Sequence, residues 1–275
     1  MKPSMGPSMR LVYLGTPAMA VPPLHALVDA GHDIALVVTG ADKRRGRGGA
    51  TSANPVKAAA LDLGLVVTHD INDVVRVEAD LGVVVAYGRI IKPHVLAHLP
   101  MINLHFSLLP RWRGAAPVER ALLAGDAQTG VCVMAVEEGL DTGGVYARAV
   151  VAVPDRATAD DLRHLLVGVG TKLLVDTLDA GLDEAETQVG EPTYAAKITP
   201  EELRIDWNAP VEQIDRLIRL GGAWTTWRDA RLKIHAADAI DGTVAPTIVQ
   251  PEGKPRMSYA DWRNGAQAAP DEWFV

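Results

Sequence analysis

The chain has 275 residues, 48% of them apolar and 22% charged, and its net charge is −7 at pH 7. This length suffices for one large and one small domain with a substantial core, and the acidic balance argues against a general nucleic-acid binder. Charged residues interrupt every apolar run before it reaches membrane-spanning length. The single cysteine, Cys132, excludes an intramolecular disulfide, and residues 1–9 contain no apolar signal-peptide region, so we expect a cytoplasmic protein without membrane attachment.

Short apolar runs alternate with helical segments through about residue 180, which is typical of a mostly parallel sheet with crossover helices. The run LGVVVA at 81–86 is apolar throughout, as expected for a strand buried on both faces. The sequence therefore predicts an α/β, Rossmann-like domain over residues 1–182. We expect its strands over 10–14, 33–39, 65–68, 81–86, 101–105, 130–136 and 145–153, and its helices over 23–30, 54–63, 90–98, 117–124 and 158–178.

The composition changes after Gly181, where a polar segment without clear periodicity predicts a linker over 183–203. Residues 204–275 then form a second, smaller domain. A helix is expected over 210–221, because Ile214, Leu217 and Ile218 share one face. Short strands over 224–227 and 232–237 make this domain β-containing, and we expect its tryptophans to pack a small core.

The first turn, Gly15-Thr16-Pro17, joins a strand to a helix. Backbone amides at such a helix start can hold an anion, although a tight turn without a ligand explains the glycine equally well. The pattern is not G-x-G-x-x-G, so a dinucleotide site is unsupported.

Two polar residues share one face of the strand expected over 101–105. Side chains alternate along a strand, so Asn103 and His105 point one way and their apolar neighbours the other. The carboxyl end of such a strand is where open α/β sheets form binding crevices, and an amide with an imidazole there can bind a carbonyl oxygen and move a proton. A structural hydrogen-bonded pair is the alternative.

The acidic, glycine-rich loop at 137–144 contains Asp141. A carboxylate here can approach an imidazole and raise its pKa, whereas a solvated loop carboxylate is the alternative.

Several motifs in order resemble the folate-dependent formyltransferase family. They are Gly15-Thr16-Pro17, Asn103-x-His105, SLLPRWRGAAP at 107–117 and Asp141-Thr142-Gly143. The run at 107–117, the loop KRRGRGG at 43–49 with NPVK at 54–57, and YAAKITPEELRIDW at 194–207 resemble the branch that formylates methionyl-tRNA. The resemblance covers nearly the whole chain after Met9.

The resemblance implies that Asn103, His105 and Asp141 are catalytic and that an amine attacks the formyl group of 10-formyltetrahydrofolate without a metal. Asn103 and a protonated His105 would stabilise the oxyanion while Asp141 orients His105. The residues implied to bind the folate are Val85, Ala86, Tyr87, Gly88, Ile90, Ser107, Leu108, Leu109, Pro110 and Leu140.

The partner that the resemblance implies is initiator methionyl-tRNA. We expect a monomer in which a basic loop contacts the tRNA phosphates. A solvated charged loop is the alternative for that basic run, and Arg111 and Arg113 can equally bind substrate or cap their own loop. The residues assigned to substrate or tRNA are Gly15, Thr16, Arg44, Arg45, Arg47, Lys57, Arg111 and Arg113.

The C-terminal region departs from the family, which ends in a small OB-like β-barrel. Only residues 240–251 separate the segments that match the beginning and the end of that barrel, so we expect a shortened OB-like domain. This shortening keeps a smaller acceptor open, such as an amino-sugar nucleotide or a ribonucleotide amine. A hydrolase that releases formate and a non-catalytic folate- or RNA-binding module are further alternatives.

Overall fold

A computed structural model describes residues 8–44, 51–240, 242–269, 272 and 274. The chain forms two compact units, each made of several sequence segments. The N-terminal unit comprises Met1–Pro117, Gln128–Ala152 and Arg163–Ala195, and the C-terminal unit comprises Val118–Ala127, Val153–Leu162 and Ala196–Val275. The domain boundaries expected at residues 182 and 203 stay predictions.

The N-terminal unit is built on a seven-stranded sheet with the order β10-β9-β7-β6-β1-β2-β5. The central strands run parallel, whereas β9 is antiparallel to β7 and β10 is antiparallel to β9. The expected mostly parallel, Rossmann-like sheet is therefore confirmed. Its strands are β1 (Arg10–Gly15), β2 (Asp33–Val38), β5 (Val67–Thr68), β6 (Leu81–Val85), β7 (Met101–His105), β9 (Gln128–Ala135) and β10 (Val145–Ala152).

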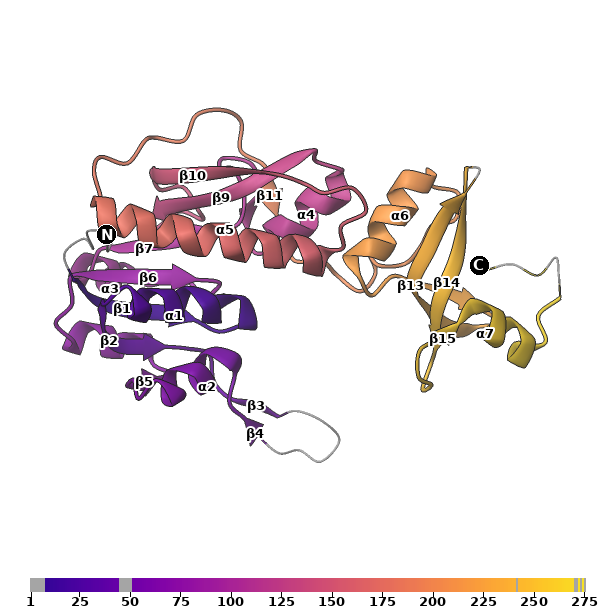
Figure 1. Cartoon of the computed structure of the whole chain (residues 1–275), viewed down its shortest axis with the longest axis horizontal. Coiled ribbons are helices and arrows are strands. Elements are labelled where there is room, and N and C mark those ends of the chain that lie inside the picture. Colours follow the sequence, from indigo (N-terminus) through magenta and orange to yellow (C-terminus); the bar gives the residue numbers. More distant parts are fainter. Residues whose placement is uncertain (1–7, 45–50, 241, 270–271, 273, 275) are drawn as a thin grey trace, which may run out of the picture. The chain divides into compact units, whose positions relative to one another are not determined.

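Apolar side chains fill both faces of this sheet. On one face, Val12 and Val84 pack with Val74 and with Val95. The other face carries α5 (Ala159–Ala180), which crosses in front of the strands in Figure 1. A side chain at Gly170 of α5 would meet Leu104 and Val131, so the missing Cβ lets the helix approach β7 and β9 closely. The remaining helices are η1 (Ala18–Ala20), α1 (Val21–Asp29), α2 (Pro55–Asp62), η2 (Ile71–Arg76) and α3 (Pro93–His98).

Two expected elements are shorter than their patterns indicated. The helix expected from residue 90 begins at Pro93, and Lys92 before it is extended, because a residue that precedes proline avoids the helical conformation. The strand expected over 65–68 pairs with β2 only through Val67 and Thr68. Two further two-stranded sheets are β3 (Lys43–Arg44) with β4 (Thr51–Ser52), and β8 (Arg113–Gly114) with β11 (Tyr194–Ala195).

The C-terminal unit contains a four-stranded antiparallel sheet rather than a closed barrel. Its core includes Ile214, Ile218, Leu232, Ile234 and Trp262. The expected α/β fold with a small, shortened β domain is thus confirmed. The elements of this unit are α4 (Pro117–Ala124), the first turn of α5, α6 (Val211–Leu220), β12 (Trp224–Trp227), β13 (Ala230–Ile240), β14 (Thr243–Pro251), β15 (Met257–Ser258) and α7 (Tyr259–Ala266).

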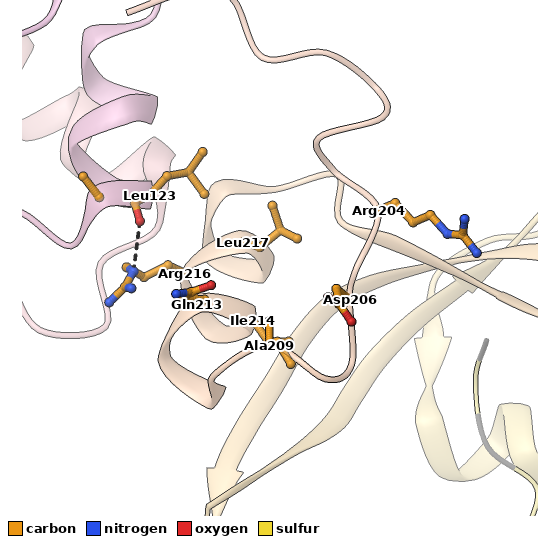
Figure 2. Close-up of a pocket in the computed structure, with 9 residues that line it drawn as sticks. Leu123, Arg204, Asp206, Ala209, Gln213, Ile214, Arg216 and Leu217 are labelled. Atoms are coloured by element: carbon orange, nitrogen blue, oxygen red, sulfur yellow. Dashed lines mark hydrogen bonds between the residues drawn. The ribbon is translucent and has the colours of Figure 1, made fainter. Parts of the chain in front are cut away.

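A hollow of about 460 Å³ lies within the C-terminal unit, between the end of α4, α6 and residues 204–209. Figure 2 shows Arg216 pointing toward Leu123, and its Nε donates a hydrogen bond to the Leu123 carbonyl at 3.1 Å. None of the residues that line this hollow is among those predicted to bind folate or to carry catalysis.

Candidate active site

Strand β7 places Asn103 and His105 on one face, as the alternation predicts. Ile102 and Leu104 are buried toward the opposite face, and His105 lies across from Cys132 of β9. Asn103 is half-buried, and no residue in the described part of the chain hydrogen-bonds to its side-chain amide. The amide of Asn103 is therefore available to a ligand at the carboxyl end of the strand.

Both ring nitrogens of His105 face oxygen atoms. Nε2 lies 2.9 Å from the carbonyl oxygen of Trp112, and Nδ1 lies 3.6 Å from Oδ2 of Asp141. A carbonyl only accepts, so Nε2 carries the proton in the neutral ring and Nδ1 is left unprotonated beside the carboxylate. Burial lowers the pKa of His105, and the Asp141 carboxylate and the Trp112 carbonyl offset this in part.

The Asp141 carboxylate is held by the backbone of a neighbouring loop. Its Oδ2 accepts a hydrogen bond of 2.7 Å from the amide of Gly114. Asp141 and Trp112 both have left-handed φ angles, of 51° and 64°, which are uncommon for residues other than glycine. The two sides of the His105–Asp141 pair thus rest on backbone that its surroundings fix.

The segment that contains Thr193 fixes the loop after β7. The amide of Trp112 donates to Oγ1 of Thr193 at 2.9 Å, and the amide of Arg113 donates to the Thr193 carbonyl at 2.8 Å. Gly114 has a φ of 122°, and a Cβ there would lie 2.9 Å from the carbonyl oxygen of Ala195. Glycine is therefore required where β8 meets β11.

Gln188 is a residue of this site that the sequence reasoning missed. Its Nε2 donates hydrogen bonds of 2.8 Å to the carbonyls of Asp141 and Gly143, and its Oε1 accepts from the guanidinium of Arg113. Gln188 lies in the polar stretch expected to be a linker, which has no periodicity.

The residues expected to bind folate near β6 follow that strand directly. Val85 ends β6 and is buried, while Ala86 and Gly88 have left-handed φ angles of 49° and 72°. Tyr87 is buried, and burial raises the pKa of its hydroxyl. Ile90 is 90% exposed. This loop therefore presents backbone groups and one apolar side chain at the carboxyl end of β6.

The other residues expected to bind folate differ in exposure. Ser107 is fully buried, and its hydroxyl donates to the carbonyl of Arg111 at 2.6 Å, so its hydroxyl supports the loop. Leu109 is buried, Leu108 and Pro110 are half-buried, and Leu140 is 62% exposed. The folate-binding role of both groups stays a prediction.

The residues expected to contact substrate or tRNA differ in their surroundings. Oγ1 of Thr16, next to buried Gly15, accepts from the amide of Gly40 at 3.1 Å. The Lys57 ammonium lies 2.6 Å from Oδ2 of Asp42, so its charge already has a partner. Arg45 and Arg47 lie outside the described residues, as does the side chain of Arg44.

Arg111 and Arg113 differ from each other. The guanidinium of Arg111 stacks on the ring of Trp112, 4.5 Å from its centroid, and is exposed. The guanidinium of Arg113 donates to Oε1 of Gln188, and the substrate role of both arginines stays a prediction.

The described residues contain no group of three histidines, cysteines or acidic residues that could hold a metal ion. Within the same residues, we find no helix with the length and apolar character needed to cross a membrane.

Comparison with known proteins identifies the class. Residues 9–178 match the family model described as formyl transferase, and residues 197–247 match the formyl transferase C-terminal domain. The chain belongs to the formyl transferase family.

One curated relative and two solved structures show which formyltransferases the chain resembles. A methionyl-tRNA formyltransferase of Roseobacter denitrificans is 44% identical over 94% of this chain and 96% of its own length. The methionyl-tRNA formyltransferase structure from Clostridium thermocellum superposes with a TM-score of 0.61 at 14% identity, covering 88% of this chain and 98% of that one. An N-formyltransferase of Helicobacter canadensis, in complex with folinic acid and dTDP-3-aminofucose, gives a TM-score of 0.65 at 16% identity, covering 86% and 98%. At these identities the two structures establish the fold.

Proposed function

We propose that this protein transfers the formyl group of 10-formyltetrahydrofolate to the amino group of methionyl-initiator tRNA. The observation that carries the proposal is the His105–Asp141 pair beside Asn103 at the end of β7, in a chain 44% identical to a methionyl-tRNA formyltransferase. We further propose that it acts as a monomer in the cytoplasm.

The site fits a formylated folate on its own chemistry. The half-buried Asn103 side-chain amide is without a partner in the described chain, and the exposed apolar side chains of Ile90 and Leu140 are among those expected to bind the folate. When bound, the folate supplies a formyl carbon that an amine can attack. The Asn103 amide would donate a hydrogen bond to the formyl oxygen as negative charge develops there. The folinic acid in the Helicobacter canadensis structure supports this ligand class.

His105 would act as the proton acceptor. Because burial lowers the pKa of His105, its imidazole is neutral at neutral pH. The resemblance had implied a protonated ring. The unprotonated Nδ1 of His105 would take the proton that the attacking amine loses, and would return it to N10 of the folate as the bond between the formyl carbon and N10 breaks. The Asp141 carboxylate, 3.6 Å away, would stabilise the imidazolium that results.

The C-terminal unit offers a surface for the tRNA. Leu232 and Ile234 of β13 point into the core, so the intervening Lys233 and the preceding Arg231 are exposed on the opposite face. Arg231 lies 3.8 Å and Arg204 5.8 Å from the centroid of the Trp224 ring. We call Arg204, Trp224, Arg231 and Lys233 the β13 basic face. Single-stranded or looped RNA is bound by cationic side chains, which contact its phosphates, and by aromatic rings, which stack on its bases.

Trp224 therefore differs from the expectation that the tryptophans pack a core. Trp227 and Trp262 do pack in the C-terminal core, at 5.1 Å between ring centroids, whereas Trp224 lies under two guanidinium groups.

The acceptor is tested by offering both kinds of amine to one enzyme. Purified protein, 10-formyltetrahydrofolate and either methionyl-initiator tRNA or a dTDP-amino sugar are incubated, and formyl-amine product is measured by mass spectrometry. We expect transfer to the tRNA. Transfer to the amino sugar alone would assign a small acceptor, and formate release without either product would assign a hydrolase.

A further inference from the structure

We infer that Gln188 is a positioning residue for formyl transfer, which fixes the Asp141 loop so that its carboxylate faces His105. The inference rests on the proposed function for its kinetic part only, because the position of Asp141 can also be measured without any substrate.

Every polar group of the Gln188 amide is used. Nε2 donates to the Asp141 and Gly143 carbonyls, both at 2.8 Å, and Oε1 accepts from Nε and Nη2 of Arg113 at 3.0 and 2.7 Å. A guanidinium has no acceptor, so Arg113 fixes which end of the amide is the oxygen. The two N–H groups must then face the loop carbonyls, and the amide has one satisfied orientation.

The Gln188 hydrogen bonds hold both segments that position the Asp141 carboxylate, namely the loop of Asp141 itself and the segment that contains Gly114. Gln188 holds the peptide of Asp141 directly, at a φ of 51° that needs support from its surroundings. Gln188 also binds the side chain of Arg113, the residue before Gly114. The Gly114 amide in turn donates to Oδ2 of Asp141. Removing Gln188 therefore loosens the carboxylate from two directions, while none of the side-chain hydrogen bonds described for Gln188 goes to His105.

The groups that face His105 determine how its pKa changes when the Asp141 carboxylate moves. Asp141 lies at Nδ1, the Trp112 carbonyl lies at Nε2, and Cys132 lies opposite on β9. Burial raises the pKa of the Cys132 thiol, which therefore stays neutral. Asp141 is thus the charged group that raises the pKa of His105, and a carboxylate that moves away leaves that pKa lower still.

The test compares Gln188→Ala and Gln188→Glu with Gln128→Ala. Gln188→Glu keeps an acceptor for Arg113 but replaces both N–H donors with oxygen, so it isolates the contact with the Asp141 loop. Gln128 is an exposed glutamine of β9 in the same unit and provides the matched control. The readouts are kcat and KM for methionyl-initiator tRNA, thermal unfolding, and an NMR titration of His105 assigned with a His105→Gln variant.

We expect both Gln188 variants to lose about 100-fold in kcat with KM within about twofold, since misplacing a catalytic group by about 1 Å has that effect. Their His105 titrations move to lower pH, and Gln128→Ala behaves like the native protein. Unchanged kcat and an unchanged His105 titration in the folded Gln188→Glu protein would overturn the inference. A native protein that does not formylate tRNA but whose His105 titration shifts in both Gln188 variants would overturn the proposed acceptor and leave the positioning role standing.

Discussion

Oδ2 of Asp141 lies 3.6 Å from Nδ1 of His105 and at the same time accepts the Gly114 amide at 2.7 Å. The first separation is longer than a hydrogen bond, because the neutral ring presents a lone pair to the carboxylate. The second contact is short and comes from backbone. The carboxylate is thus anchored before the imidazole gains a proton, and the electrostatic attraction becomes strong only when the proton arrives.

The anchored carboxylate predicts the behaviour of Asp141→Asn. The amide oxygen of asparagine can still accept from Gly114, so we expect a folded protein with a nearly unchanged melting temperature. Without the negative charge the imidazolium loses its stabilisation, and single-turnover formyl transfer should fall by at least about 100-fold. Transfer within about threefold of the native rate would show that the charge of Asp141 is dispensable.

The pKa of His105 predicts how activity depends on pH. Burial lowers this pKa below its ordinary value of 6.5, and in the proposed mechanism the neutral ring is the active form. The value of kcat/KM should therefore rise with pH through the lowered pKa and be level above about pH 6.5. A profile measured from about pH 5 to pH 8 checks this. A rate that increases as the pH falls below 6.5 would instead require the protonated ring.

The close contact of Gly114 with Ala195 predicts that alanine destabilises the protein at position 114 but not at position 168. Gly114→Ala would force a φ of 122° on alanine and bring its Cβ to 2.9 Å from the Ala195 carbonyl, so both the melting temperature and activity should fall. Gly168→Ala is the control, since Gly168 lies inside α5 and its Cβ would meet open space. We expect that variant to gain about 0.5–1 kcal/mol in unfolding free energy by denaturant titration. Equal responses at the two positions would contradict the packing described.

The β13 basic face predicts the salt dependence of tRNA binding. Arg231→Ala combined with Lys233→Ala should weaken binding and reduce the slope of log affinity against log salt by roughly 2. Arg228→Ala is the matched control, because Arg228 also stacks on a tryptophan, 4.0 Å from the Trp227 centroid, but is paired with Glu272. A slope that changes as much in the control as in the double variant would remove this face from the tRNA interface.

Elements with a strong local signal could be predicted from the sequence. The strand at 101–105 and the helix at 117–124 have the expected ends, since Pro100 and Pro117 mark their beginnings. The β13 strand, expected to end at residue 237, extends to Ile240, because pairing with β14 continues beyond the apolar run. Cross-strand pairing is a tertiary contact that composition does not encode.

The residues of the candidate site likewise differ in whether a local sequence pattern predicts them. Strand alternation alone places Asn103 and His105 on one face, whereas Asp141 required the family resemblance. Gln188 had neither signal, because it lies in an irregular segment and bonds to a residue 47 positions away. Local patterns cannot identify such a contact, which depends on how the segment at 183–195 returns to the sheet.

The most direct test of the catalytic assignment is single-turnover formyl transfer by Asn103→Ala, with methionyl-initiator tRNA in excess of its dissociation constant. The side-chain amide of Asn103 makes no hydrogen bond within the described chain, so its loss should leave folding and tRNA binding intact. Oxyanion stabilisation by the Asn103 amide predicts a rate lower by about 100- to 1,000-fold, as for the loss of one oxyanion donor. A folded, tRNA-binding Asn103→Ala protein that transfers formyl groups at the native rate would contradict it.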